Sequence, residues 1–110
     1  MAIIKEDNGL ISGGSKFYTE TTTYGNKTIT CGFKPKVIIV NRSDSSANYG
    51  YGCVYAEENV TGSPAQKSIG DSANWISLGG SSYTCIDSIT DTGFVMKTAN
   101  TAACKIYAWG

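Results

Sequence analysis

Short alternations of hydrophobic and polar residues run through the chain, and no stretch has the period of a helix. In "KTITC" (27–31), Ile29 and Cys31 fall on one side and the threonines on the other, as in a strand with one buried face. "YGYGCVYAE" (49–57) alternates in the same way. No window of about a dozen residues has apolar positions at helical spacing. The pattern therefore predicts an all-β protein.

Turn-forming residues divide the chain into short strands. Glycine, serine, threonine and asparagine make up two fifths of the residues, which is typical of strands joined by tight turns. Eight or nine strands at regular spacing favour a single antiparallel β-sandwich, jelly-roll-like or related. The expected strands are 2–6, 16–23, 27–31, 37–40, 49–57, 75–78, 83–90, 93–98 and 104–109.

The turn sequences also predict how some strands pair. We expect 16–23 and 27–31 to form a hairpin across "YGN", and the last three strands to form a meander. Residues 58–74 have no clear pattern, and an irregular stretch of that length is expected to be functional or mobile.

"CGFKPKVIIVNRSD" (31–44) contains the most distinctive strand. Gly32 permits a bend, Pro35 belongs at a strand start, and Phe33 is placed to close one end of a core. Four apolar residues without alternation follow, and they predict a strand that is central or that is covered on its second face by another sheet or subunit. These core or oligomer residues are Val37, Ile38, Ile39 and Val40.

The domain organisation is simple. Residues 1–15 are expected to form an N-terminal strand and a flexible joint, "SGGS", and residues 16–110 the β-sandwich domain. The opening "MAIIKEDNGL" resembles neither a signal peptide nor a membrane anchor, so we expect folding in a cytoplasm.

Charge excludes two classes of partner. Only 16% of the residues are charged, and the net charge is zero. The chain therefore has no basic face for nucleic acid and no polybasic patch for anionic lipid. We expect neither nucleic-acid binding nor membrane insertion.

The usual residues of catalysis and metal binding are scarce. There is no histidine. The four cysteines, none in a CxxC pair, are expected to be free buried thiols, with a disulfide framework as the less favoured alternative. Two carboxylate pairs remain for an enzyme, Asp87 with Asp91 and Glu57 with Glu58. Asp91 is placed to cap a turn, and neighbours in a strand face opposite ways. We therefore expect no enzyme, metal or cofactor.

Aromatic residues among polar ones are the one hint of ligand binding. Tyr49 and Tyr51 flank a glycine beside Asn48, and Trp75 ends a long polar stretch. Such rings can stack on sugars while amides bind the hydroxyls. The other interpretation is that these rings belong to the core or to an interface, as we expect for the packing of Trp109.

Three segments resemble a known family. "GFKPKVIIVNRS" (32–43), "CIDSITDTGFVMKT" (85–98) and the closing "KIYAWG" (105–110) are similar to a β-sandwich module of tailed-bacteriophage virion appendages, of the tail-fibre or tail-tip type. The run "FYTETTTYGNKTITCGFKP" (17–35) is similar to the family's approach to its proline corner. The matching residues are turn and core residues, so the family contributes no catalytic motif.

The resemblance implies a non-enzymatic structural protein of a phage or prophage virion. Its partners would be further copies of itself, with a trimer favoured, other virion proteins and a host-surface glycan. The protein would be made and assembled in the cytoplasm of a bacterial host and would act in the virion. The alternative is a stand-alone carbohydrate-binding module that uses Tyr49, Tyr51 and Trp75.

Overall fold

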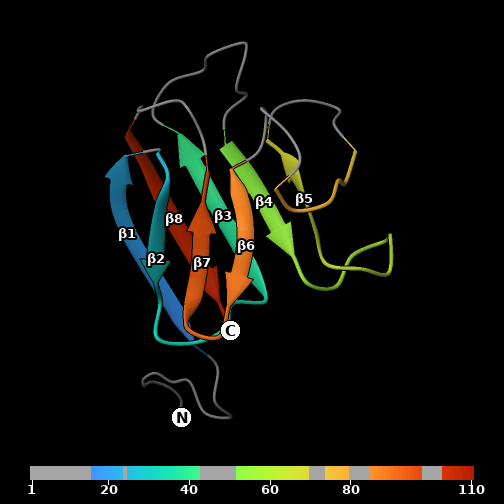
Figure 1. The fold of residues 1–110 in the computed structure, drawn as a ribbon, viewed down its shortest axis with the longest axis horizontal. Coiled ribbons are helices and arrows are strands. Elements are labelled where there is room, and N and C mark those ends of the chain that lie inside the picture. Colours follow the sequence, from blue (N-terminus) through green and yellow to red (C-terminus); the bar gives the residue numbers. More distant parts are fainter. Residues whose placement is uncertain (1–15, 24, 43–51, 70–73, 80–84, 98–102) are drawn as a thin grey trace, which may run out of the picture.

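The computed structural model describes residues 16–23, 25–42, 52–69, 74–79, 85–97 and 103–110, and these form eight strands and no helix. The all-β prediction is therefore confirmed (Figure 1). The strands are β1 (Phe17–Thr23), β2 (Lys27–Thr30), β3 (Val37–Arg42), β4 (Gly52–Ala56), β5 (Ala65–Ser68), β6 (Ile86–Thr90), β7 (Gly93–Met96) and β8 (Ala103–Trp109).

The strands form two antiparallel sheets packed face to face. The larger has five strands in the order β1-β8-β3-β4-β5, and the smaller has three in the order β2-β7-β6. In Figure 1 the smaller sheet lies in front of the larger one. This arrangement is the predicted β-sandwich.

The core lies between the sheets and is built by alternation. In β8 the residues Cys104, Ile106 and Ala108 are buried, whereas their neighbours point outward. β7 contributes Phe94 and Met96, both fully buried. The core cluster comprises Ile29, Phe33, Ile38, Val40, Cys53, Tyr55, Cys85, Ile86, Phe94, Met96, Cys104, Ile106 and Ala108.

The Gly-Phe-Lys-Pro corner carries the chain from the smaller sheet to the larger one. Gly32 has a φ of 90°, and its N–H donates to the carbonyl of Thr92, 3.0 Å away. Phe33 is buried and closes the end of the core, as predicted. It packs so tightly on the chain end that a Cβ on Gly110 would lie 2.6 Å from its ring.

β3 is the central strand of the larger sheet, which confirms that prediction. Ile38 and Val40 are completely buried in the core. Val37 and Ile39 point to the opposite face, which none of the eight described strands covers, and Val37 is 36% exposed. The apolar run thus places two residues in the core and two on the outward side of the larger sheet.

The predicted hairpin of the first two strands is wrong. β1 pairs with β8, and β2 pairs with β7 in the other sheet. Each strand has one inward side, represented by the partly buried Tyr18 in β1 and the buried Ile29 in β2. The two strands therefore face each other across the core instead of lying side by side.

Two other sequence predictions also need correction. The pairing of β6 with β7 is confirmed, but β8 does not continue a meander, because it inserts between β1 and β3. The stretch 58–74 contains the unpredicted strand β5, and 75–78 contributes only a bridge between Ile76 and Gln66. The predicted strand 2–6 and joint 12–15 lie outside the described residues.

Candidate functional site

The outward side of the larger sheet carries a row of apolar and aromatic side chains. Strand register places Trp109 between Phe17 on β1 and Val37 on β3, and places Tyr107 beside Ile39. Val54 on β4 lies next to Ile39 in turn. We call this surface the outer face, and it consists of Phe17, Val37, Ile39, Val54, Tyr107 and Trp109.

The rings of the outer face form a nearly continuous plate. Tyr107 and Trp109 are two residues apart on β8, so they point the same way, with ring centroids 6.3 Å apart and planes only 16° apart. Phe17 approaches Trp109 at 5.4 Å between centroids, tilted by 50°. Phe17 is 54% exposed and Trp109 38%. Trp109 therefore packs on neighbouring rings, as expected, but on a surface and not in the core.

Basic side chains border this plate. The ammonium of Lys105 lies 5.8 Å from the centre of the Tyr107 ring, within range of a cation–π interaction. Lys67 continues the row beyond Val54. None of the outward residues of the described strands of this sheet is acidic. The outer face is thus apolar at its centre and weakly positive at its margin.

Only one of the predicted sugar-stacking residues lies in the described part of the chain. Trp75 is half-buried beside β5, and the ammonium of Lys67 lies 5.4 Å from its ring centre. That contact occupies one side of the ring. Asn48, Tyr49 and Tyr51 lie outside the described residues.

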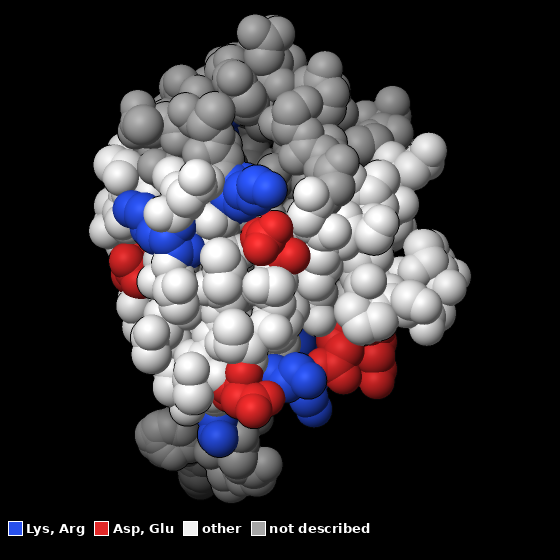
Figure 2. All heavy atoms as spheres, viewed as in Figure 1, with Lys and Arg blue, Asp and Glu red and all other residues white. Residues whose placement is uncertain are grey.

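The outward side of the smaller sheet carries a shallow hollow of about 300 Å³. Lys27, Asp87 and Lys97 supply its charges, and Figure 2 shows basic and acidic side chains together on the upper part of this face. Neither a cysteine, a serine nor a histidine is among the described residues that line it. The described residues that line it therefore leave Thr28, the two lysines and Asp87 as candidates for a nucleophile or base.

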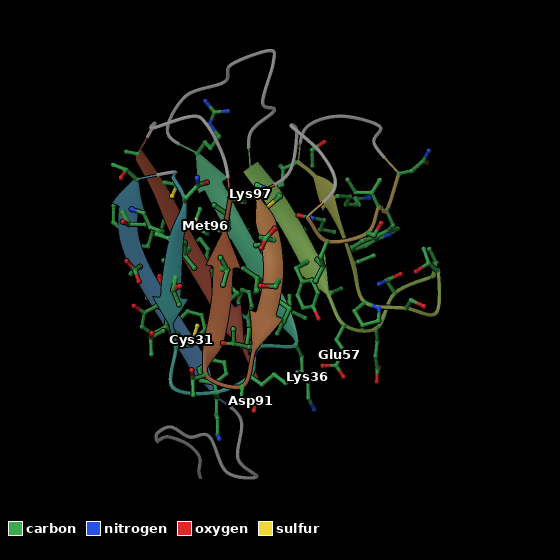
Figure 3. All side chains as sticks on the ribbon, in the orientation of Figure 1. Cys31, Lys36, Glu57, Asp91, Met96 and Lys97 are labelled. Atoms are coloured by element: carbon green, nitrogen blue, oxygen red, sulfur yellow. The ribbon has the colours of Figure 1, made fainter. Side chains whose placement is uncertain are left out.

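One of the two carboxylate pairs that the sequence suggested for catalysis, Asp87 with Asp91, is not brought together in the fold. Asp87 lies within β6, whereas Asp91 is exposed in the turn after it, about 13 Å further along at strand spacing. Glycosidase carboxylates are about 5–9.5 Å apart. Glu57 and Glu58 follow β4, and Figure 3 shows Glu57 and Asp91 at the same end of the sandwich but on separate turns.

The isolated thiols are poorly suited to nucleophilic catalysis. Cys104 lines a second hollow, of about 230 Å³, and burial raises its pKa to about 11. Burial also raises the pKa of Cys31. Both thiols therefore stay protonated near neutral pH, and the thiolate is the reactive form. Among the described residues no cluster of three or more histidine, cysteine or acidic side chains is arranged to hold a metal ion.

Comparisons with protein-family models, with curated proteins and with solved structures find no match to this chain. Among the described residues there is also no helix long and apolar enough to cross a membrane.

Sequence reasoning singled out the β3 part of the outer face, within the run from Val37 to Val40, but missed its aromatic residues on β1 and β8. The signal on β8 was the alternation in "CKIYAW", where Lys105, Tyr107 and Trp109 share the side opposite the buried residues. That pattern separates two faces but does not say which one is the core. The partners of Tyr107 and Trp109 on β1 and β3 come from distant parts of the sequence.

Proposed function

We propose that this chain is a non-enzymatic structural module of a tailed-phage or prophage virion appendage and that it self-associates through the outer face. The observation that carries the proposal is the exposed aromatic plate of Phe17, Tyr107 and Trp109. Soluble monomers rarely expose a contiguous apolar patch larger than a few hundred Å². The resemblance of 32–43, 85–98 and 105–110 to virion appendage modules supports the assignment to a virion.

A second copy of the chain is the partner that fits the outer face best. The net charge is zero, so two copies do not repel one another over distance. The five strands of the larger sheet have four to seven residues each; with a spacing of about 4.8 Å and a rise of about 3.3 Å per residue, they span roughly 450 Å². A standard interface buries about 800 Å² per partner. Two copies that met through this face would bury about 900 Å² in total, which is the low end of the range for specific interfaces.

A charge placed in the centre of the outer face tests this interface. Tyr107→Glu should leave the β-sheet circular dichroism spectrum unchanged and convert the oligomer to a monomer in sedimentation velocity. The matched control is Val95→Glu, because Val95 is half-buried and belongs to the smaller sheet. If both variants dissociate alike, or neither does, the outer face is not the interface.

The virion assignment needs a separate test. Antibodies against the chain should label the tail region of particles released by the bacterial host, when the particles are viewed by immunogold electron microscopy. Labelling confined to soluble protein in the lysate would contradict the assignment. This result would not affect the conclusion on self-association, so each part of the proposal can be rejected without the other.

Glycan binding is the second candidate, and the nearly parallel Tyr107 and Trp109 rings favour it. Two parallel rings about one sugar apart form a platform on which a glycan chain can stack. A Trp109→Ala variant should then lose retention on immobilised polysaccharide, whereas Trp75→Ala should keep it. Loss in Trp75→Ala alone would instead point to the site predicted around Asn48, Tyr49 and Tyr51. If the wild-type chain is not retained on any glycan tested, the hypothesis of glycan binding is rejected.

A further inference from the structure

Two cysteines from opposite sheets meet inside the core. Cys53 belongs to β4 in the larger sheet, and Cys85 directly precedes β6 in the smaller one. Their Sγ atoms are 2.6 Å apart, and both residues are buried, with 0% and 2% exposure. They are separated by 32 positions in the sequence, so their contact is a product of the tertiary fold.

The Sγ–Sγ distance is shorter than the separation of two reduced sulfur atoms in ordinary van der Waals contact. Non-bonded sulfurs pack at well over 3 Å, whereas a disulfide bond is about 2.0 Å long and requires side chains directed at one another. Cys53 and Cys85 already have that direction across the core. The other two thiols, Cys31 and Cys104, do not belong to this pair.

We propose that Cys53 and Cys85 form an intrachain disulfide that ties the two sheets together. The oxidant is a low-molecular-weight disulfide of the glutathione class. One protein thiolate attacks it, forming a mixed disulfide and releasing one small thiolate, and the second protein thiolate then attacks the mixed disulfide and releases the other. The protein loses two protons and two electrons, and the small disulfide takes up both to give two thiols.

Burial determines when this reaction takes place. An oxidant cannot reach either sulfur in the closed sandwich, so the bond forms while the chain folds or when the sheets separate. The same burial later protects the bond from reductants. The disulfide itself does not depend on the proposed function.

The chain is well suited to mapping the bond, because trypsin places each cysteine on a different peptide. Cleavage after lysine and arginine, except before proline, gives 28–36, 43–67, 68–97 and 98–105. The wild-type chain is unfolded, refolded with oxidised glutathione, blocked with iodoacetamide and digested without reductant. We expect one linked species, 43–67 joined to 68–97, and alkylated Cys31 and Cys104.

Single serine variants serve as controls. Cys31→Ser and Cys104→Ser should retain the linked species, and Cys53→Ser and Cys85→Ser should lose it. Linkage of 43–67 to 98–105, a mixture of pairings, or four fully alkylated cysteines after oxidative refolding would overturn the proposal. The decisive mapping uses the wild-type chain, so it holds even if a variant fails to fold.

A stability measurement complements the peptide mapping. The oxidised wild-type chain should unfold at a higher urea concentration than the same chain reduced with a phosphine, because the bond constrains the unfolded chain. Cys104→Ser should show the same difference between its oxidised and reduced forms. Equal midpoints for oxidised and reduced wild type would contradict a bond that ties the sheets.

Discussion

Gln66 holds the edge of the larger sheet to the smaller one, and its replacement should be costly. Its side chain is completely buried, with Nε2 donating to the carbonyl of Ile86 at 2.8 Å and Oε1 accepting from the Ile86 N–H at 3.0 Å. Nε2 also approaches the carbonyl of Ser77 at 3.3 Å. The amide therefore links β5 of the larger sheet to the backbone at the start of β6 in the smaller sheet.

The effect of Gln66→Leu can be worked out from these contacts. The Ile86 carbonyl keeps the N–H of Gly79, 2.9 Å away, as a partner. The Ile86 N–H loses its acceptor and stays buried, at a cost of about 1–3 kcal/mol, and the lost 2.8 Å bond adds about 1 kcal/mol. We expect a loss of about 2–4 kcal/mol from a total stability of roughly 5–15 kcal/mol. The melting temperature should fall by roughly 10–15 °C.

Urea unfolding followed by circular dichroism measures this loss. The matched control is Lys67→Met, which changes the next residue on the opposite side of β5 and should cost at most about 1 kcal/mol. Gln66→Glu keeps an acceptor for Ile86 but buries a carboxylate against a carbonyl, so its stability relative to wild type should fall as pH rises above about 4. A Gln66→Leu variant within about 0.5 kcal/mol of wild type would refute the reasoning.

Two further predictions concern a glycine and a tyrosine. Gly52 has a φ of 125°, and a Cβ there would lie 1.7 Å from the Val40 carbonyl oxygen, so Gly52→Ala should lose more than about 3 kcal/mol in urea unfolding. Gly62→Ala should lose only about 1 kcal/mol, since nothing lies within 4 Å of that position. The hydrogen bond that Tyr18 donates to the Glu20 carboxylate raises the pKa of Tyr18 to about 12. The folded chain thus keeps a proton that the unfolded chain releases above about pH 10, so stability falls between about pH 10 and 12, and Tyr18→Phe should flatten that fall in urea unfolding. Equal losses for the two glycine variants, or the same alkaline slope for Tyr18→Phe and wild type, would contradict these predictions.

The local pattern predicted strands and their buried sides well. The alternation around Ile29 and in "CKIYAW" corresponds to β2 and β8, and the proline corner with Phe33 was recognised from turn chemistry alone. These features depend on neighbours in the sequence. Alternation therefore separates the two sides of a strand, and the tertiary fold decides which of them is buried.

Pairing partners could not be predicted in the same way. A turn such as "YGN" can join two strands of a hairpin or two strands in different sheets. Here it joins strands in different sheets, because β1 pairs with β8 over seven residues. β5 was missed because its buried residues include Gln66 and Ser68, which look like surface residues in a sequence. The outer face and the Cys53–Cys85 contact combine distant segments, so neither has a local signature.

Self-association is the central claim, and the mass of the unmodified chain in solution tests it most directly. Light scattering coupled to size-exclusion chromatography would be run on the wild-type chain from about 10 to 100 µM, where a modest interface is populated. The account predicts a mass of at least twice the 11.6 kDa of the single chain. A mass of 11.6 kDa at every concentration would contradict it.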